Sequence, residues 1–246
     1  GDPMPWLFQW PGMLGPIELL GLNADGVGVL NIAPEIDGVT RRVPLIMTVG
    51  DETYPAVAVE VIRAAVGDPS YQIKAGEAGV QAVRVPGWDT IYTDQHARIW
   101  LRWNKDFPTI SSTDDLSAVQ GRVVVVGLTA EGLATTIASP LGTQYAHTPI
   151  AVSIETIING DNIVRSDIAD TYELAYIFAL GLLLILAARF LHYGVVAGLI
   201  IIIGVGTVYG SVQLYSTRLL LFDFSWPVIT TILVGLHAVF NRFVSE

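Results

Sequence analysis

Cysteine is absent from this chain of 246 residues, so disulfides, thiolate nucleophiles and zinc sites with cysteine ligands are excluded. Basic residues are also few, with 13 Lys and Arg against 23 Asp and Glu, for a net charge of −10. Because a nucleic-acid surface needs clustered Lys and Arg to neutralise phosphates, this balance argues against nucleic acid as a partner.

Charge is scarcest in the last third of the chain. After residue 170 the only ionised side chains are Arg189, Arg218 and Arg242, with Glu173, Asp223 and Glu246. Over the whole chain 52% of residues are hydrophobic and only 15% are charged, and the mean hydropathy is +0.52. This composition is too apolar for a soluble domain of the same length, so part of the chain is expected to face lipid.

Three apolar runs in this last third, at about 172–191, 195–215 and 219–240, each have a length suited to crossing a membrane. A bilayer core of about 30 Å needs about 20 apolar residues in a helix. Buried helices of a large soluble core are the alternative, which the short links between the runs disfavour. We therefore predict a water-soluble domain over 1–168 and three transmembrane helices within 169–246.

The orientation follows from the basic residues near the predicted helix ends. Short links make neighbouring helices antiparallel, so Arg189, His192 and Arg242 share one side and Arg218 lies on the other. The excess of basic residues marks the cytoplasmic side. The prediction is a multi-pass protein of the cell inner (plasma) membrane, with a periplasmic or extracellular N-terminal domain and a cytoplasmic C-terminus. Since no signal peptide opens the sequence, we also expect an export helix upstream and a longer parent protein.

Small and polar residues within the apolar runs are candidates for packing and function. Gly194, Gly198, Gly206 and Gly210 form small-xxx-small patterns, which allow close approach of a helix from a second copy or another membrane partner. The alternative is that glycine is simply common in membrane helices. His237 is a polar residue inside the third run and a functional candidate by default. An interfacial hydrogen bond is favoured for it over a proton or metal site.

The first part of the chain alternates strand and helix signals. A strand is predicted over 43–49, and a helix over 56–66 with Thr53 as its cap. The unbroken β-branched run at 123–126 predicts a central strand that is covered on both faces. A further helix is predicted over 150–158. This alternation predicts an α/β domain with a mixed sheet.

Motifs for chemistry are missing from this domain. The glycine-rich turn at 127–132 lacks the Gly-Lys-Ser/Thr ending of a phosphate-binding loop, so a plain strand-to-helix turn is favoured there. The four histidines are isolated, and no serine lies in a Gly-x-Ser-x-Gly elbow. We therefore predict no catalytic residue, no metal site and no cofactor in this chain.

Two adjacent arginines, Arg41 and Arg42, lie at the start of the strand predicted over 43–49. Paired guanidinium groups can hold an anionic small ligand through bidentate hydrogen bonds. The alternative, which the many nearby carboxylates favour, is that both arginines form ion pairs that only orient the strand.

The succession of four segments resembles the extracellular sensory domain called CHASE, type 2 (cyclases/histidine kinases associated sensory extracellular). The segments are Asp-Gly-Val to Arg-Val-Pro-Leu over 37–45, Tyr-Pro-Ala over 54–56, Ile-Trp-Leu-Arg-Trp with Phe-Pro-Thr-Ile-Ser over 99–111, and Gly-Arg-Val-Val-Val-Val-Gly to Ser-Pro-Leu over 121–141. The resemblance covers about 27–165, and the three membrane helices usual in this family match 172–240. The sequence departs from the family pattern in lacking its first half and in the stretch 147–151.

The resemblance implies an extracytoplasmic input module whose helices lead to a cytoplasmic enzyme, most often a class III adenylate or guanylate cyclase and otherwise a kinase. A homodimer would suit a cyclase, whose catalytic sites form between subunits in that family. The alternative is a non-catalytic accessory or structural subunit of a larger membrane complex. A membrane-bound hydrolase is a third hypothesis, supported only by scattered serines and acidic residues.

Overall fold

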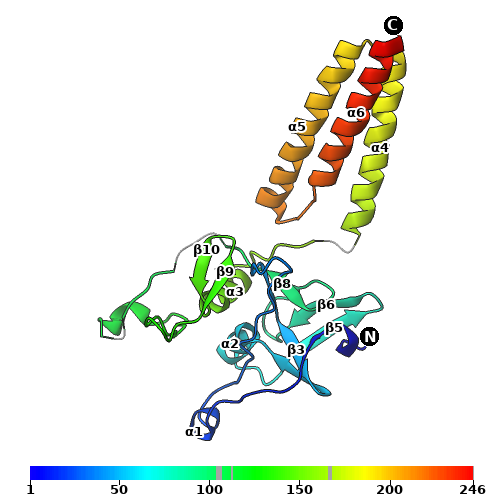
Figure 1. Cartoon of the computed structure of the whole chain (residues 1–246). Coiled ribbons are helices and arrows are strands. Elements are labelled where there is room, and N and C mark those ends of the chain that lie inside the picture. The colour runs from blue at the N-terminus through cyan, green and yellow to red at the C-terminus, as the bar shows by residue number, and fades with distance from the viewer. Residues whose placement is uncertain (104–106, 112, 166–167, 246) are drawn as a thin grey trace. The chain divides into compact units, whose positions relative to one another are not determined.

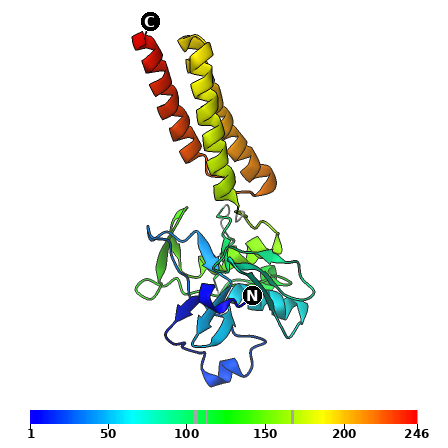
Figure 2. The same ribbon diagram turned by 90° about the vertical axis from the view of Figure 1, so that its right-hand side faces the viewer.

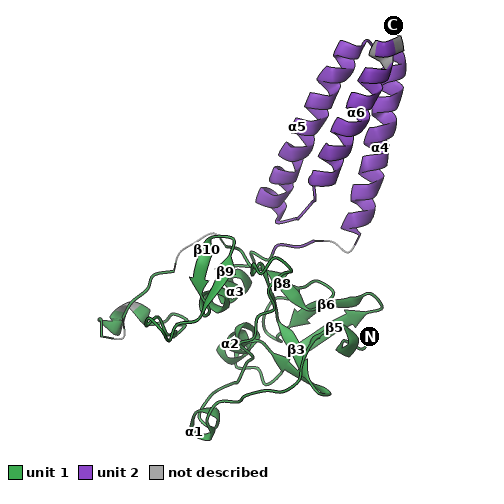
Figure 3. Cartoon of the chain, in the orientation of Figure 1, with its two compact units in different colours: residues 1–162 green, residues 163–246 purple. Residues whose placement is uncertain are grey.

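The computed structural model divides into two compact units, Gly1–Asn162 and Ile163–Glu246 (Figure 3). It describes residues 1–103, 107–111, 113–165 and 168–245. The division falls a few residues before the domain boundary predicted at 168. The reason is that Val164 pairs with Leu220 in an isolated parallel β-bridge, which joins the segment before the first long helix to the second unit.

The first unit is a mixed α/β domain, coloured from blue to green in Figure 1. Its elements are η1 (Met4–Trp6), β1 (Phe8–Trp10), α1 (Glu18–Gly21), β2 (Arg42–Pro44), β3 (Ile46–Val49), β4 (Glu52–Pro55), α2 (Val57–Val66), β5 (Gln72–Gly76), β6 (Gly79–Arg84), β7 (Ile91–Tyr92), β8 (Arg98–Trp100), η2 (Leu116–Val119), β9 (Thr136–Ser139), β10 (Gly142–Tyr145) and α3 (Thr148–Ile158). The predicted fold class, mixed α/β, is confirmed.

The strands form small sheets. β1 pairs with β3 in parallel, whereas β3 and β4 form an antiparallel hairpin. β2 pairs with β8, β5 to β7 form a meander, and β9 with β10 forms a second hairpin. Buried apolar residues in or next to β3, α2, β6, β8 and α3 make one core, in which the least exposed large side chains are Leu45, Ile46, Val59, Ile62, Val83, Val85 and Ile99. Each such side chain contributes about 1.5–3 kcal/mol by leaving water.

The predictions for the strand expected over 43–49 and for the helix after it need two corrections. The strand expected over 43–49 is interrupted at Leu45, which separates β2 from β3. Thr53 does not cap a helix, because it lies in β4 opposite Thr48, and α2 follows Ala56 instead. Antiparallel pairing with β3 therefore outweighs the local capping signal. The predicted end of the helix is confirmed, since Gly67 adopts a left-handed conformation with φ 75°.

The central strand expected over 123–126 is not present. These residues have no regular secondary structure, and the side chain of Val126 is 91% exposed. A β-branched run gives strand propensity but cannot supply the neighbouring strand that would hydrogen-bond to it. The helix predicted over 150–158 is confirmed as α3, which begins two residues earlier with Pro149 in its first turn.

The second unit is a bundle of three helices, α4 (Ala169–Phe190), α5 (Tyr193–Arg218) and α6 (Ser225–Ser245). α6 packs closely against both α4 and α5, and the three run side by side in the views of Figures 1 and 2. The third helix was expected to start at 219 and instead starts at Ser225. The delay arises because Leu219 adopts a left-handed conformation with φ 53°, which ends α5 and opens a turn of six residues, 219–224.

Among the described residues, two helices are long and apolar enough to cross a membrane. These are α4, with 22 residues and a mean hydropathy of 1.9, and α5, with 26 residues and a mean hydropathy of 2.2. α6 is apolar over the shorter stretch Ser225–Asn241. A third transmembrane span therefore stays a prediction.

Candidate functional site

Arg42 is the better enclosed of the two predicted ligand-binding arginines. Its Nε and Nη2 atoms donate to the two carboxylate oxygens of Glu35, both at 2.6 Å. Its Nη1 donates to Asp94 Oδ2 at 3.1 Å, and the guanidinium lies 4.7 Å from the centre of the Trp100 ring. Because β2 pairs with β8, Arg42 lies directly opposite Trp100, which positions the cation over the aromatic face.

Arg98, in β8, completes this group of charges. Its Nε donates to Asp94 Oδ2 at 2.8 Å, and its guanidinium lies 5.6 Å from the centre of the Phe8 ring. The other oxygen of Asp94 accepts the backbone N–H groups of His96 and Arg98. We call Glu35, Arg42, Asp94 and Arg98 the β2 ion cluster. It contains two cations and two anions.

The electrostatics of the β2 ion cluster follow from these contacts. The hydrogen bonds from Arg42 lower the pKa of the Glu35 carboxyl below its usual value, while partial burial opposes that change. Burial works to lower the pKa of Arg42, but its bonds to Glu35 and Asp94 outweigh it and leave that pKa raised. Since each charge is already paired, an anionic ligand would have to displace Glu35 or Asp94 to reach Arg42.

Arg41 also pairs with a carboxylate, at the surface. Its Nη2 and Nη1 atoms donate to the two oxygens of Asp37 at 2.8 Å and 3.0 Å. The hydrogen bonds from Arg41 lower the pKa of Asp37 to about 2. Both arginines thus have the ion-pair arrangement that the sequence left as the alternative to ligand binding. The contact between Arg42 and Asp94 spans 52 residues of sequence, so local spacing could not reveal it.

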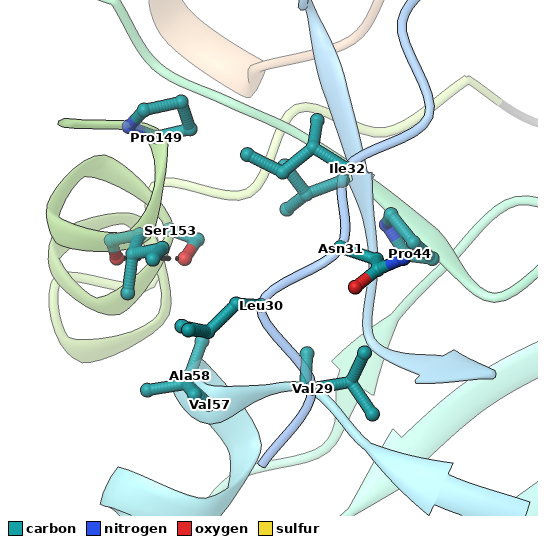
Figure 4. Close-up of a pocket in the computed structure, with 12 residues that line it drawn as sticks. Val29, Leu30, Asn31, Ile32, Pro44, Val57, Ala58, Pro149 and Ser153 are labelled. Carbon is teal, nitrogen blue, oxygen red and sulfur yellow. Dashed lines mark hydrogen bonds between the residues drawn. The ribbon is translucent and has the colours of Figure 1, made fainter. Parts of the chain in front are cut away.

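A shallow pocket lies beside β2, between the segment 29–32, the start of α2 and α3 (Figure 4). It has about 270 Å³ of empty space, much of it open to solvent, and most of its lining is apolar. The hydroxyl of Ser153, which lines it, donates to the Ile150 carbonyl at 2.8 Å. The pocket therefore offers little polar chemistry for recognising a charged ligand.

The four predicted packing glycines of α5 have open surroundings. A Cβ atom added at Gly198, Gly206 or Gly210 would meet no atom within 4 Å, and one at Gly194 would meet only the His192 ring, at 3.4 Å. The close glycine contact within the bundle is made by α6 instead, where a Cβ at Gly235 would collide with Ile200.

The predicted polar residue of the third helix, His237, bonds within its own helix. Its Nε2 atom lies 2.8 Å from the side-chain nitrogen of Asn241, one turn further on. The described residues hold no group of three or more His, Cys, Asp or Glu side chains that could bind a metal ion. The side chain of Arg242, on which the predicted orientation partly depends, lies outside the described residues.

Sequence reasoning missed one carboxylate of the helical unit. Glu173 lies near the start of α4 and is only 8% exposed. Both its oxygens accept from Arg165, at 3.0 Å and 2.9 Å, and Oε1 also accepts the backbone N–H of Asp223 at 2.8 Å. A lone acidic residue at the start of an apolar run was the available signal, because an ionised group there needs a partner.

The chain joins a mixed α/β unit to a helical unit in which two helices are long and apolar enough to cross a membrane. Comparison with known families gives a more specific result. The model of the CHASE2 domain matches residues 8–188, well over half of the chain, and the chain therefore belongs to the CHASE2 family. CHASE2 is an extracellular sensory domain of signal-transduction proteins. No curated protein and no solved structure matches the chain.

The family match is longer than the resemblance derived from motifs, which covered about 27–165. It begins at β1 and continues into α4. The residues outside the motif range are 8–26, which contain β1 and α1, and 166–188, which contain most of α4. The sequence had already related the apolar run of α4 to the first membrane helix of the family.

Proposed function

We propose that this chain is the sensory and transmembrane part of a receptor that controls a cytoplasmic class III adenylate or guanylate cyclase. The observation that carries the proposal is the CHASE2 match over residues 8–188, which continues from the α/β unit into α4. The sensory domain and a helix able to cross a membrane thus belong to one family unit. A ligand can switch such a unit only if the unit has two conformations and the ligand binds one of them more tightly than the other.

The proposed topology has the α/β unit on the periplasmic or extracellular side of the inner membrane and the C-terminus in the cytoplasm. α6 serves as the third span in this proposal. The proposed orientation is supported by Arg189, which lies in the last turn of α4 next to the link formed by Leu191 and His192. A basic residue beside a short link favours the cytoplasmic side for that link.

Labelling of single cysteines tests this topology, because residues 1–246 contain no cysteine to give a background. Glu131→Cys places a thiol at an exposed position of the α/β unit, and Leu191→Cys places one in the α4–α5 link. A membrane-impermeant maleimide should label Glu131→Cys in intact cells and Leu191→Cys only after lysis. The reverse pattern would exclude the proposed orientation.

The proposed partner in the membrane is a second copy of this chain, packed along the glycines of α5. The support is that Gly198, Gly206 and Gly210 have room for another backbone, which van der Waals packing in lipid rewards. Dimer formation would bring together two output domains. A small anionic ligand at Arg41 and Arg42 is also proposed, with the requirement that it displace the carboxylates paired there.

A fusion of residues 1–246 to a class III cyclase catalytic domain tests the output. The double substitution Gly198→Leu with Gly206→Leu should reduce both self-association in the membrane and cyclic-nucleotide production. Ala197→Leu adds the same bulk on α5 at an exposed position beside this glycine face and serves as the control. If the unsubstituted fusion, the double glycine variant and Ala197→Leu all have equal cyclase activity, and the chain co-purifies stably with another membrane protein, an accessory subunit would be favoured instead.

A further inference from the structure

The segment that opens the helical unit is fastened to the turn between α5 and α6. Val164 donates its backbone N–H to the Leu219 carbonyl at 2.9 Å, and its own carbonyl accepts the N–H of Leu221 at 3.0 Å. Val164 and Leu220 thus form a short parallel bridge. Because the two segments are far apart in sequence, these bonds tie the entry of the unit to the start of its last helix.

A charged side chain strengthens this attachment. Arg165 follows directly after Val164 and makes a bidentate ion pair with Glu173 of α4. The Glu173 side chain is 11% exposed and that of Arg165 is 28% exposed, so the pair is largely shielded from water. Arg165 also pairs with Asp170, whose side chain is 85% exposed. Shielding makes the pair with Glu173 the stronger restraint.

The same carboxylate of Glu173 holds the turn. Its Oε1 atom accepts the N–H of Asp223 at 2.8 Å. Asp223 in turn accepts the N–H of Ser225, the first residue of α6, at 2.8 Å, and Ser211 of α5 donates to the Phe222 carbonyl at 2.9 Å. Residues of all three helices therefore meet at this turn, with Glu173 in contact with both the entering segment and the turn itself.

We propose that Arg165, Glu173 and Asp223 form a clasp that couples movement of the segment entering the helical unit to the α5–α6 turn, with Glu173 as the positioning residue. The clasp rests on the proposed sensory function, because it states where a signal passes to α6. Its physical basis is that displacing residues 163–165 either moves the turn with them or breaks the two bridge hydrogen bonds and leaves Glu173 without its cation. The clasp therefore favours two discrete arrangements, closed and open.

Hydrogen exchange on the full chain in membrane vesicles tests the clasp. The amides of Leu221 and Asp223 donate to Val164 and Glu173 in the closed state and should exchange slowly. Glu173→Ala removes the acceptor of the Asp223 amide and the ion-pair partner of Arg165, which follows Val164. It should therefore speed exchange at both amides about tenfold or more, while amides in the middle of α4 keep their protection. Asp170→Asn is the matched control, because it removes a carboxylate that pairs with Arg165 only at the surface, and it should leave the turn unchanged.

A cysteine pair gives a second readout. Val164→Cys with Leu220→Cys can form a disulfide across the bridge, and this bond should restore slow exchange at 219–223 in the Glu173→Ala variant. The clasp is excluded if Glu173→Ala changes exchange at the turn by less than about twofold. It is also excluded if exchange rises equally along all of α4, since Glu173 would then stabilise the bundle as a whole.

The outcome is separable from that of the proposed function, because hydrogen exchange needs no output domain. If the clasp is excluded while cysteine labelling gives the proposed topology and the cyclase fusion responds to the glycine substitutions, the receptor function is supported and the clasp is not its signalling route. If hydrogen exchange supports the clasp but cyclase activity in the fusion does not change with the α5 substitutions, the receptor hypothesis is contradicted and the structural coupling is retained.

Discussion

The α/β unit and the helical unit differ in how many of their large apolar side chains are buried. In the α/β unit the most buried side chains are apolar, among them Leu45, Ile46, Met47, Val83 and Ile99. In the helical unit many large apolar side chains point outward, including Phe178, Leu182, Ile201, Ile202 and Phe240. The helical unit buries fewer large apolar side chains, among them Leu180, Leu184 and Val196, together with the polar side chains of Glu173, Thr207, Ser211 and Thr231.

The many outward-facing apolar side chains of the helices indicate that the two units are stabilised by different forces. Removal of apolar surface from water drives the folding of the α/β unit. If lipid surrounds the helices, apolar transfer no longer distinguishes inside from outside, and close packing with hydrogen bonds between helices must hold the bundle. The comparison therefore predicts different responses of the two units to the same substitutions.

The largest expected effect is that of a cavity in the α/β core. Leu45→Ala should lower the free energy of unfolding of this unit by about 2–5 kcal/mol, because Leu45 is fully buried. Ile202→Ala, at a side chain 68% exposed on α5, should change bundle stability little. Urea unfolding in mild detergent measures both. Equal losses would show that Ile202 is not on a lipid-facing surface of the monomer.

Overpacking should be most damaging in the helical unit where backbones approach closely. Gly235→Leu places a side chain against Ile200 and should destabilise the bundle by about 1–3 kcal/mol. Gly206→Leu, made at a glycine with open surroundings, should leave the bundle of one chain intact and weaken only self-association. Thermal unfolding in detergent, followed by circular dichroism, separates the two. Comparable loss in both variants would contradict the open glycine face.

The β2 ion cluster should make the stability of the α/β unit depend on pH in the acid range. Because the pKa of Glu35 is lower in the folded chain than its ordinary value of 4.5, the folded state binds fewer protons than the unfolded state just below that pH. Its stabilisation is therefore fully present above pH 4.5 and is lost as the pH falls through the folded pKa. Glu35→Gln should cost about 1.5 kcal/mol at neutral pH and remove this part of the acid dependence.

The surface pair supplies the control for Glu35→Gln. Asp37→Asn removes an exposed ion pair with Arg41 and should have a much smaller effect on stability at neutral pH. Unfolding measured across the acid range should retain the contribution of Glu35 in this variant. If Asp37→Asn removed more of the acid dependence than Glu35→Gln, the assignment of the cluster would be wrong.

The smallest expected effect is that of a single hydrogen bond between helices. The Tyr176 hydroxyl lies 3.0 Å from Thr207 Oγ1, joining α4 to α5. A double-mutant cycle with Tyr176→Phe and Thr207→Val should give a coupling of about 0.6 kcal/mol, the average for such pairs in membrane bundles. A coupling near zero would indicate that packing alone holds the two helices.

Sequence patterns were most informative where the signal is long or local. The apolar runs predicted all three long helices, and Gly67 marked the end of α2. Sequence patterns failed where the conformation of a segment depends on pairing with another strand. Thr53 joined a strand because β3 lies beside it, and the β-branched run at 123–126 stayed exposed without a strand to pair with.

The candidate sites divide along the same line. The sequence singled out Arg41 and Arg42, yet Arg42 is paired with Glu35, seven residues away, and with Asp94, in a distant turn. Local charge density suggested ion pairing in general terms. The particular partner Asp94 depends on the pairing of β2 with β8, which brings its turn next to Arg42.

The division into a polar α/β part and an apolar helical part can be predicted from the amino-acid sequence alone, as can the motif succession that is typical of the CHASE2 family. These properties depend on composition and residue order, which need no contacts between distant residues. Which charges meet depends on the folded structure, as the β2 ion cluster and the contacts among Arg165, Glu173 and Asp223 show. Ion pairs and backbone hydrogen bonds act over a few ångströms, so they exist only after folding has brought distant segments together.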